Sequence, residues 1–336
     1  MSTAKQPGPV ETVLPPLIGD SPAIERARAM IDRFAATNIP VLIIGATGTG
    51  KELVARHVHA HSGRVGRFVP VNCGAMPRDI AESLLFGHRR GAFSGAVESR
   101  LGQVERAHGG TLFLDELLSL PTEVQPKLLR ALDTGEIQPL GEAEERCVDV
   151  RVVASAQESL TARLAAGDLR YDLFQRIAGV LIRLPSLAAR PQDTVPLAVY
   201  FARTQGRSLE PECARLLLAY PWPGSVRELR MAVERAGQLV RNGTITPAAL
   251  AEAIEIGAPG RLDERAAARA ELAGVCKANA YDARGIAAAL GVARSTLFER
   301  LRVLGISLRE LKKSGESADG PRTFRTLDGE GAPLTP

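Results

Sequence analysis

The sequence predicts an α/β protein in which a parallel β-sheet with flanking helices is followed by two helical segments. Short apolar runs alternate with helical stretches between residues 21 and 184, which is the pattern of strands joined through crossover helices. A glycine-rich turn links the first of these strands to a helix. From Asp193 onward the pattern turns helical.

Length and composition describe an ordinary multi-domain protein. The 336 residues are long for one hydrophobic core, so we expect two or three domains. No run approaches the ~18 apolar residues of a membrane span, and the N-terminal stretch is not signal-like. Four cysteines are too scattered for a metal knuckle or a disulfide framework, which predicts free thiols and a cytoplasmic location: Cys73, Cys147, Cys213 and Cys276.

The first elements lead into a phosphate-binding loop. Ser21-Pro22 predicts a helix start, with Ser as the cap, and the helix runs to about Thr37. Val41–Ile44 is a strand buried on both faces. The next residues fit G-x-x-x-x-G-K, whose amides, helix N-terminus and lysine cradle the β- and γ-phosphates of a nucleotide. The alternative is a glycine-rich turn with a chance lysine. The predicted nucleotide-binding residues are Gly45, Ala46, Thr47, Gly48, Thr49, Gly50, Lys51 and Glu52.

Glu52 departs from the general loop, because Ser or Thr normally offers Mg²⁺ a hydroxyl at this position. A metal must then rely on other carboxylates and water. The stretch Gly109–Glu116 is an apolar strand ending in two carboxylates. Paired with the phosphate loop, Asp115 would hold Mg²⁺ and Glu116 would polarise the attacking water. The alternative is a buried strand that merely ends in acidic residues.

Asn72 closes a neighbouring strand, Phe68–Val71, and its amide is predicted to hold Glu116 away from the water. The other predicted elements of this region are helices over Arg78–Phe86 and Pro121–Thr134 and strands over Val150–Ser155 and Val180–Leu184. Arg170 and Arg176 lie six residues apart and need not share a helix face. They are either ordinary surface residues or arginine fingers that reach a neighbour's γ-phosphate.

Four helices are predicted after Asp193: Thr194–Thr204, Pro211–Ala219, Val226–Arg241 and Pro247–Ile254. Ser225 is expected to cap the third of them. That places Arg227 in its first turn, from which it would reach back to the phosphates. Ile256–Gly260 is predicted to be a linker.

The C-terminal module carries the positive charge of the chain. Residues 276–313 hold eight basic and three acidic residues, a net charge of +5. Helices over Ala283–Leu290 and Arg294–Leu304 flank a glycine-containing turn, which is the helix-turn-helix pattern of DNA-binding proteins. A plain helical hairpin is the alternative. The predicted DNA contacts are Arg294, Ser295, Thr296, Arg300 and Arg302.

A loop of small residues surrounds one aromatic side chain, Phe93. By composition alone a surface turn is favoured over a loop that presents this side chain to a partner. The residues of the loop are Gly91, Ala92, Phe93, Ser94, Gly95 and Ala96.

These motifs resemble those of the bacterial enhancer-binding proteins, the AAA+ activators of sigma-54 RNA polymerase, over about residues 17–306. Gly45–Glu52, including the unusual Glu52, is similar to the family's Walker A, and Gly109–Glu116 to its Walker B. Gly91–Ala96 is similar to the Gly-Ala-Phe-Thr-Gly-Ala loop, which implies a contact with sigma-54 and reverses the interpretation as a turn. The resemblance makes Asn72 the glutamate switch.

The resemblance also implies that Arg170 and Arg176 are arginine fingers, that Arg227 is the sensor II arginine, and that the C-terminal module is a Fis-type domain. The chain departs from the family pattern at several positions. Ala46 replaces a common Glu, Ser94 replaces Thr, and Arg89-Arg90 replace a usually acidic site. Ala156 lacks the sensor I hydroxyl, which puts efficient coupling of hydrolysis in doubt but not nucleotide binding.

The resemblance implies a sigma-54-dependent transcriptional activator. Such a protein binds upstream DNA, assembles into a ring that is expected to be a hexamer, and uses ATP with Mg²⁺ to open the closed promoter complex. One rival is a DNA-binding regulator that binds ATP without hydrolysing it efficiently; another is an AAA+ remodeller of other proteins. Only residues 1–16 precede the AAA+ region, so the usual regulatory domain is expected to be absent and a separate regulatory protein is a candidate partner.

The expected division of the chain follows from these assignments. It consists of a disordered tail (1–16), an AAA+ α/β subdomain (17–185), a helical lid (186–256), a linker (257–264), a Fis-type helix-turn-helix domain (265–313) and a second disordered tail (314–336).

Overall fold

The computed structural model describes residues 14–157, 160–257, 271–290, 292, 294–304 and 306–308. Residues 1–13 of the first expected tail, residues 258–264 of the expected linker, the whole second tail and the side chain of Arg302 lie outside the described residues. The chain divides into two compact units, residues 1–218 with 222–253 and residues 254–336 with 219–221.

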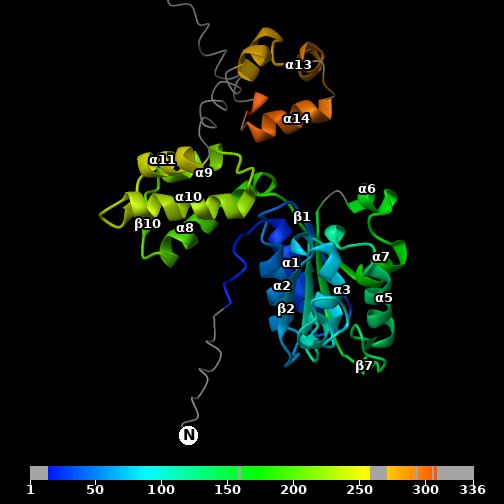
Figure 1. Ribbon diagram of the computed structural model, residues 1–336. Helices are drawn as coiled ribbons and strands as arrows, with labels where there is room; N and C mark the ends of the chain where they lie inside the picture. Colours follow the sequence, from blue (N-terminus) through cyan, green and yellow to red (C-terminus); the bar gives the residue numbers. More distant parts are fainter. Residues whose placement is uncertain are drawn as a thin grey trace, which may run out of the picture. The chain divides into compact units, whose positions relative to one another are not determined.

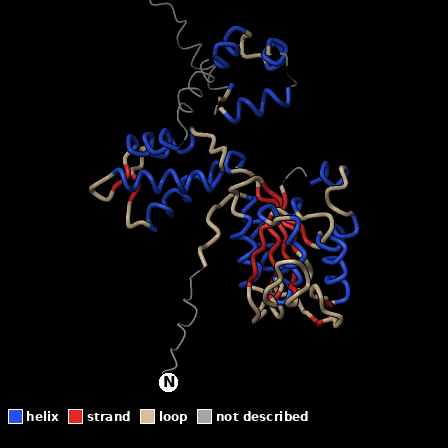
Figure 2. Tube along the Cα trace, viewed as in Figure 1, coloured by secondary structure: helices blue, strands red, loops and turns tan. Residues whose placement is uncertain are grey.

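The first unit is built on a five-stranded parallel sheet of order β2-β5-β8-β1-β9, drawn red in Figure 2. Its strands are β1 (Val41–Gly45), β2 (Phe68–Asn72), β5 (Thr111–Asp115), β8 (Arg151–Ala156) and β9 (Val180–Leu184). Its α-helices are α1 (Pro22–Phe34), α2 (Lys51–Ala60), α3 (Arg78–Phe86), α4 (Gln103–Arg106), α5 (Gln125–Thr134), α6 (Leu160–Ala165) and α7 (Tyr171–Ile177). Helices cover both faces of the sheet, α1 and α2 one face and α5 and α7 the other (Figure 1). The predicted α/β fold is confirmed.

Short elements complete this layer: two 3-10 turns, η1 (Cys73–Ala75) and η2 (Leu117–Ser119), and two small hairpins, β3 (Gly87–His88) with β4 (Arg100–Leu101) and β6 (Glu136–Ile137) with β7 (Arg146–Cys147).

Side chains of β1 alternate between two hydrophobic clusters. Leu42 and Ile44 pack in the cluster that includes residues of α3, α5 and α7, whereas Val41 and Ile43 pack with α1 and α2. All four are at most 4% exposed. Burial on both faces explains why this strand is a continuous apolar run rather than an alternating one.

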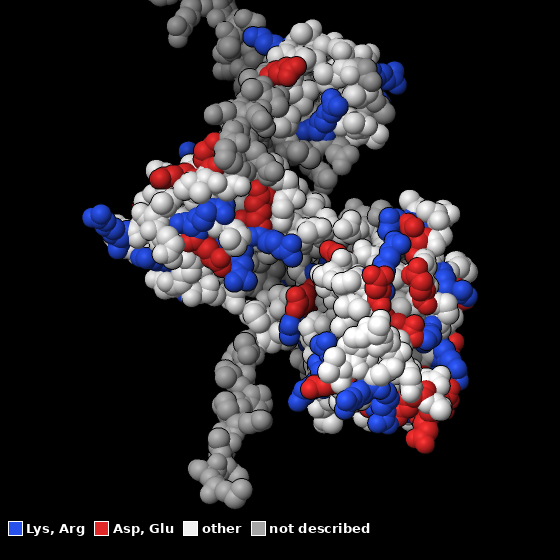
Figure 3. All heavy atoms as spheres, in the orientation of Figure 1, with Lys and Arg blue, Asp and Glu red and all other residues white. Residues whose placement is uncertain are grey.

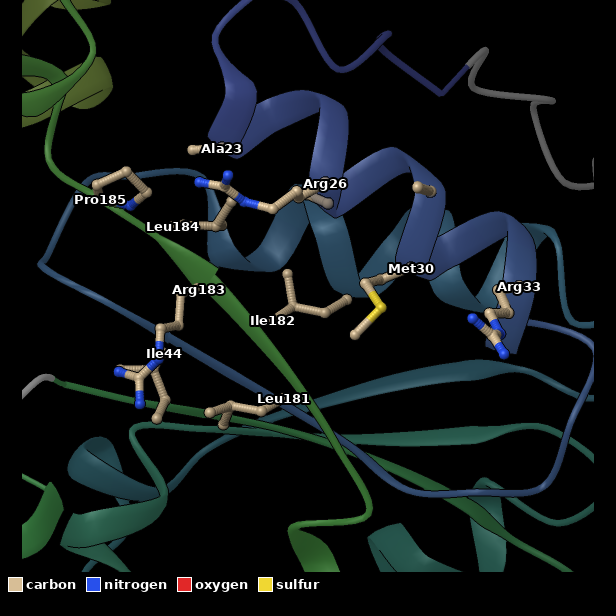
Figure 4. Close-up of a pocket in the computed structure, with 12 residues that line it drawn as sticks. Ala23, Arg26, Met30, Arg33, Ile44, Leu181, Ile182, Arg183, Leu184 and Pro185 are labelled. Carbon is tan, nitrogen blue, oxygen red and sulfur yellow. The ribbon is translucent and has the colours of Figure 1, made fainter.

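A hollow of about 550 Å³ lies between α1 and the edge strand β9. Figure 4 shows Arg26, Met30 and Arg33 extending from α1 and Ile182 from β9. The side chains that line it include arginines and apolar residues but no carboxylate. The hollow therefore offers no acidic group for metal or proton-transfer chemistry.

The helices after the sheet are α8 (Thr194–Thr204), α9 (Cys213–Ala219), α10 (Ser225–Leu239) and α11 (Pro247–Gly257), with a two-stranded ribbon of β10 (Ser208–Leu209) and β11 (Thr244–Ile245). The predicted cap of α10 is wrong. Gly224 occupies the N-cap position, and the hydroxyl of Ser225 instead accepts a hydrogen bond of 3.0 Å from the Leu187 amide. Ser225 is buried and has a φ of 57°, and its hydroxyl contacts the Leu187 amide rather than the helix amides.

A buried ion pair connects the phosphate loop to the start of the helical region. Arg190 precedes the 3-10 turn η4 (Pro191–Asp193), and Asp193 ends it. The two side chains are 3% and 0% exposed, and their charged atoms lie 3.5 Å apart. Arg190 donates to the Thr49 carbonyl oxygen at 3.0 Å. Asp193 accepts from the amides of Asp20 and Ser21 at 2.9 Å each. Burial lowers the pKa of Arg190, and the charge of Asp193 opposes this shift.

Asp193→Asn should destabilise the folded first unit by about 3–5 kcal/mol, because it leaves the buried Arg190 charge without its counter-charge. Asp168→Asn is the matched control, since Asp168 pairs with Arg163 at the surface, with 39% and 47% of the side chains exposed. We expect less than about 1 kcal/mol there. Urea unfolding followed by circular dichroism measures both. Equal shifts for the two variants would contradict the role assigned to the ion pair.

The described part of the second unit contains a small hydrophobic core to which three helices contribute. A helix over residues 271–278 precedes α13 (Ala283–Ala289) and α14 (Arg294–Val303). Asp282 caps α13 through a 2.8 Å hydrogen bond from the Gly285 amide. The core is formed by buried residues from all three helices, including Cys276, Ile286 and Leu297. Both helices predicted around the tight turn are present.

Candidate functional site

The phosphate loop follows β1 and curls as its glycines require. Gly48 and Gly50 have φ values of 78° and 101°, in the region that disfavours other residues. A Cβ at Gly48 would lie 2.3 Å from the Gly224 carbonyl oxygen. The Lys51 ammonium donates to the carbonyl oxygens of Gly45 and Ala46 at 2.9 and 3.0 Å. The lysine therefore spans the mouth of the loop that the sequence predicted.

Four predicted site residues act on one another electrostatically. Burial lowers the pKa of Lys51, the charges of Asp115 and Glu116 raise it, and the charge of Arg227 lowers it. Arg227 also reaches the loop through its backbone, since its amide donates to the Gly48 carbonyl oxygen at 3.1 Å. The structure thus gathers Lys51, both carboxylates and Arg227 around the phosphate loop.

Parallel pairing explains how separate sequence motifs meet. Asn72 of β2 is in register with Asp115 of β5, and Ile44 of β1 with Ala156 of β8. The carboxyl ends of these strands therefore share one edge of the sheet, which is where ligands bind in such folds. Glu116 follows Asp115 with φ 55° and ψ 47°, a left-handed conformation.

Asn72 lies beside Glu116 but holds a different group. Its side-chain oxygen accepts from the amides of Gly74 and Ala75 at 2.8 and 3.1 Å. Among the hydrogen bonds of the described residues none joins Asn72 to Glu116. A Cβ at Gly74 would lie 2.2 Å from a Glu116 carboxylate oxygen and 3.3 Å from the Asn72 oxygen. The two side chains therefore flank the same glycine, and the predicted switch contact stays a prediction.

The donor set around Asp115 fits Mg²⁺. One oxygen of the partly exposed Asp115 carboxylate accepts a hydrogen bond from the Ser155 hydroxyl, and among the hydrogen bonds of the described residues none engages the other oxygen. Mg²⁺ is commonly held by one or two carboxylates, water and substrate phosphates, so Asp115 with bound phosphates suffices. No cluster of three or more metal-ligating side chains exists within the described ranges. Glu52 forms an exposed ion pair with Arg56 at 2.7 Å.

Arg170 and Arg176 lie on the surface around α7. Arg170 is the residue before the helix and pairs with Asp172 at 2.7 Å; Arg176 pairs with Asp133 at 3.0 Å. Their side chains are 49% and 47% exposed. Both guanidinium groups thus lie at the surface of the unit, and each forms an ion pair with an acidic residue of its own chain.

The loop Gly91–Ala96 is an exposed turn on a fixed base. Its ends are joined by a 2.9 Å bond from the Gly91 amide to the Ala96 carbonyl oxygen. Phe93 is 38% exposed, with its ring edge against His88 at 5.1 Å between centroids. Arg89, at the base, pairs with Glu142 at 2.7 Å. The loop therefore presents an aromatic side chain and the Ser94 hydroxyl to the solvent.

The predicted DNA contacts begin α14. Arg294, Ser295, Thr296 and Arg300 are exposed, whereas Leu297 is buried in the module core. Exposed Lys277 and Arg284 extend the basic character to the other helices. Figure 3 shows basic side chains on the face of this module that it displays. Exposed basic side chains of this kind are the type of group that contacts nucleic acid.

Two features of the site escaped the sequence motifs. The hydroxyl of Ser155 contacts Asp115 and accepts a 3.1 Å hydrogen bond from the Glu116 amide. Arg190 holds the phosphate loop through Thr49. A hydroxyl at the end of a buried strand next to the Asp-Glu strand was the signal for Ser155. No local signal marks the contact of Arg190 with the phosphate loop, since Thr49 is 141 positions away in the sequence.

Comparisons with known proteins agree with this geometry. Residues 17–183 match the Sigma-54 interaction domain, and residues 189–267 match the AAA+ ATPase lid domain. The chain is 41% identical over 301 residues to the C4-dicarboxylate transport transcriptional regulatory protein DctD of Rhizobium meliloti, covering 87% of this chain and 65% of that protein. It is 40% identical to the response regulator protein PilR of Pseudomonas aeruginosa, covering 76% and 59%.

A solved structure of NtrX from Brucella abortus in complex with ADP is similar as well, with a TM-score of 0.66 and 32% identity, covering 87% of this chain and 70% of that one. The complex of NtrX with ATP gives a TM-score of 0.63 and 34% identity, covering 86% and 69%. The chain spans between 44% and 65% of the length of the curated relatives it matches. None of the helices within the described ranges is long and apolar enough to cross a membrane. The chain belongs to the family of AAA+ transcriptional regulators that carry a sigma-54 interaction domain.

Proposed function

We propose that this protein is a sigma-54-dependent transcriptional activator that couples ATP hydrolysis to opening of the promoter complex. The observation that carries the proposal is the single sheet edge on which the phosphate loop, Asp115 and Glu116 meet, within a domain that also exposes the Gly91–Ala96 loop. Nucleotide binding is supported by the similarity to NtrX, which was solved with ADP and with ATP.

The chemistry follows from the positions of the side chains. Loop amides and Lys51 bind the β- and γ-phosphates. Asp115 is the ligand available to Mg²⁺, which when bound neutralises charge on the phosphates. Glu116 accepts the proton of the attacking water. Arg227 binds phosphate from the same subunit, while Arg170 and Arg176 extend from the neighbouring subunit of a ring, which we expect to be a hexamer.

The remaining parts supply the partners. The Gly91–Ala96 loop contacts sigma-54, and α14 holds the protein at upstream DNA through Arg294, Ser295, Thr296, Arg300 and Arg302. We place the protein in the cytoplasm, where its transcriptional partners are. A separate protein could regulate it.

One observation favours a second candidate, a DNA-binding regulator that binds ATP without efficient hydrolysis. Ala156, at the sensor I position, is buried and carries no hydroxyl. The intact pair Asp115-Glu116 and the exposed Phe93 favour the activator. Steady-state ATPase assays with and without promoter DNA separate the two candidates.

The assignment of the Gly91–Ala96 loop predicts variants that hydrolyse ATP but do not bind sigma-54. Phe93→Ala and Ser94→Ala should keep most ATPase activity, because neither side chain touches the nucleotide site, but should lose sigma-54 binding in the presence of ADP-aluminium fluoride. Val97→Ala is a matched control, since Val97 is 75% exposed just outside the loop. Native gel shifts with sigma-54 measure the complex. Normal activation by both loop variants would show that the contact lies elsewhere.

The DNA-binding assignment predicts two kinds of loss. Arg294→Ala should weaken specific binding by about 1–3 kcal/mol and relax sequence preference, since the first residues of a recognition helix meet base edges. Arg302→Ala should weaken all DNA binding and flatten its salt dependence, as a phosphate contact does. Arg241→Ala is the control, because Arg241 is an exposed arginine of the first unit and lies outside this module. Fluorescence anisotropy with specific and random duplexes distinguishes these outcomes, and unchanged affinities for both arginine variants would refute the assignment.

A further inference from the structure

The hydroxyl of Ser155 joins the two acidic residues of the nucleotide site. It donates a hydrogen bond to Asp115 Oδ1 and accepts one of 3.1 Å from the Glu116 amide. Ser155 is 0% exposed, so water does not compete for either bond. One buried side chain thus fixes a carboxylate orientation and a backbone position at consecutive residues.

The Glu116 amide depends on this hydroxyl. The β5–β8 ladder ends with the pair Leu114 and Ala154, one residue short of the acidic pair. Among the hydrogen bonds of the described residues the Glu116 amide has no main-chain acceptor. Glu116 also adopts a left-handed conformation that residues other than glycine rarely take, and such conformations persist where surrounding contacts hold them.

The bond to Asp115 leaves a defined donor for a metal. Because Oδ1 is engaged by Ser155, the other carboxylate oxygen remains available. A fixed carboxylate is a better ligand than a rotating one, since groups that orient a metal ligand tune its affinity. The hydroxyl therefore has two effects. It raises metal affinity by orienting Asp115, and it sets the position of the Glu116 carboxylate by holding the Glu116 backbone amide.

The strand geometry separates this hydroxyl from the missing one at residue 156. Successive side chains on a strand point to opposite faces, so Ser155 and Ala156 face different sides of β8. Ala156 packs in the core cluster that contains Leu42 and Leu114. The Ser155 hydroxyl therefore approaches Asp115 and Glu116 from one side of β8. A hydroxyl at residue 156 would lie on the other side of the strand.

We propose that Ser155 is a positioning residue for ATP hydrolysis, which orients Asp115 for Mg²⁺ and fixes Glu116 for the attacking water. The proposal rests on the proposed ATPase function. The Ser155 hydroxyl thus contacts the acidic residues of the site, whereas Ala156 has no hydroxyl.

The test compares Ser155→Ala with Thr111→Val in the full-length protein. Thr111→Val also removes a buried strand hydroxyl, but Thr111 lies at the opposite end of β5 and pairs with His59 at 2.9 Å. Ser155→Ala should lower kcat by roughly 10–100-fold, the usual effect of losing a group that orients a metal ligand. Thr111→Val should leave kcat unchanged. Thermal melting checks that both variants are folded.

A binding measurement provides a readout independent of turnover. A fluorescent ATP analogue is titrated in excess Mg²⁺ and in EDTA. Wild type and Thr111→Val should bind more tightly with Mg²⁺, and Ser155→Ala should lose at least about threefold of that gain while its affinity in EDTA is unchanged.

The outcomes are distinct. Wild-type kcat and wild-type Mg²⁺ dependence in folded Ser155→Ala would overturn the inference, and so would equal losses in Thr111→Val. If the wild-type protein binds ATP but does not hydrolyse it, the ATPase proposal fails, and the Mg²⁺-dependent binding of Ser155→Ala then decides whether Ser155 orients Asp115.

Discussion

Glu116→Gln should bind ATP as tightly as the wild type and hydrolyse it about 10²–10⁴-fold more slowly, because the amide cannot accept the proton of the attacking water. The substitution keeps the size of the side chain, so its packing over Gly74 is retained. Lys51→Ala should instead abolish binding, since it removes the ammonium at the mouth of the phosphate loop. Binding of a fluorescent ATP analogue and phosphate release measure the two effects separately.

Glu123→Gln is the matched control for this pair, because Glu123 is an exposed residue in the same region of the chain. Its kcat and affinity should equal those of the wild type. Equal turnover in Glu116→Gln and the wild type would refute the assignment of Glu116. A loss of affinity in Glu116→Gln as large as in Lys51→Ala would show that Glu116 acts in binding rather than in chemistry.

Arg170→Ala and Arg176→Ala should each lose hydrolysis by about 10³–10⁵-fold, the contribution of arginine fingers in other phosphoryl-transfer enzymes. The reason is their placement: both are about half exposed, and each pairs with an acid of its own chain. Exposed ion pairs of this kind stabilise a fold by little, so a large loss of activity would not reflect unfolding.

Mixing either arginine variant with Glu116→Gln should restore part of the activity. A mixed ring contains sites in which an intact Glu116 faces an intact arginine from the next subunit. Arg130→Ala, which removes another exposed arginine paired with one acid, should behave as the wild type. Rings that form but show no rescue in any mixture would mean that these arginines do not act across the interface.

Local patterns predicted much of the fold. The strand Val180–Leu184 and the helices Arg78–Phe86 and Thr194–Thr204 have the predicted bounds. Helix ends were less certain, since α1 ends at Phe34 rather than near Thr37 and α5 begins four residues after Pro121. Helix ends fray and often tighten into turns, so a local pattern predicts them less well than it predicts the helix itself.

The wrong prediction of a helix cap at Ser225 has a tertiary cause. A Ser before a helical stretch normally indicates an N-cap. Here its hydroxyl accepts a hydrogen bond from the Leu187 amide, which is 38 positions away in the sequence. The contacts of Ser155 and Arg190 escaped prediction for the same reason. The phosphate loop and the acidic strand end could be predicted because their chemistry lies within one continuous stretch, whereas these contacts depend on strand order and register.

Formation of an open complex at a sigma-54 promoter tests the central claim most directly. Purified protein, sigma-54 RNA polymerase and promoter DNA with its upstream site are combined, and strand opening is followed by permanganate footprinting. We expect opening by the wild-type protein with ATP. We expect none with a non-hydrolysable analogue, with Glu116→Gln or with Phe93→Ala. Strand opening without ATP hydrolysis would contradict the proposed activator function. It would also be contradicted if the wild-type protein hydrolysed ATP in the same mixture but did not open the promoter.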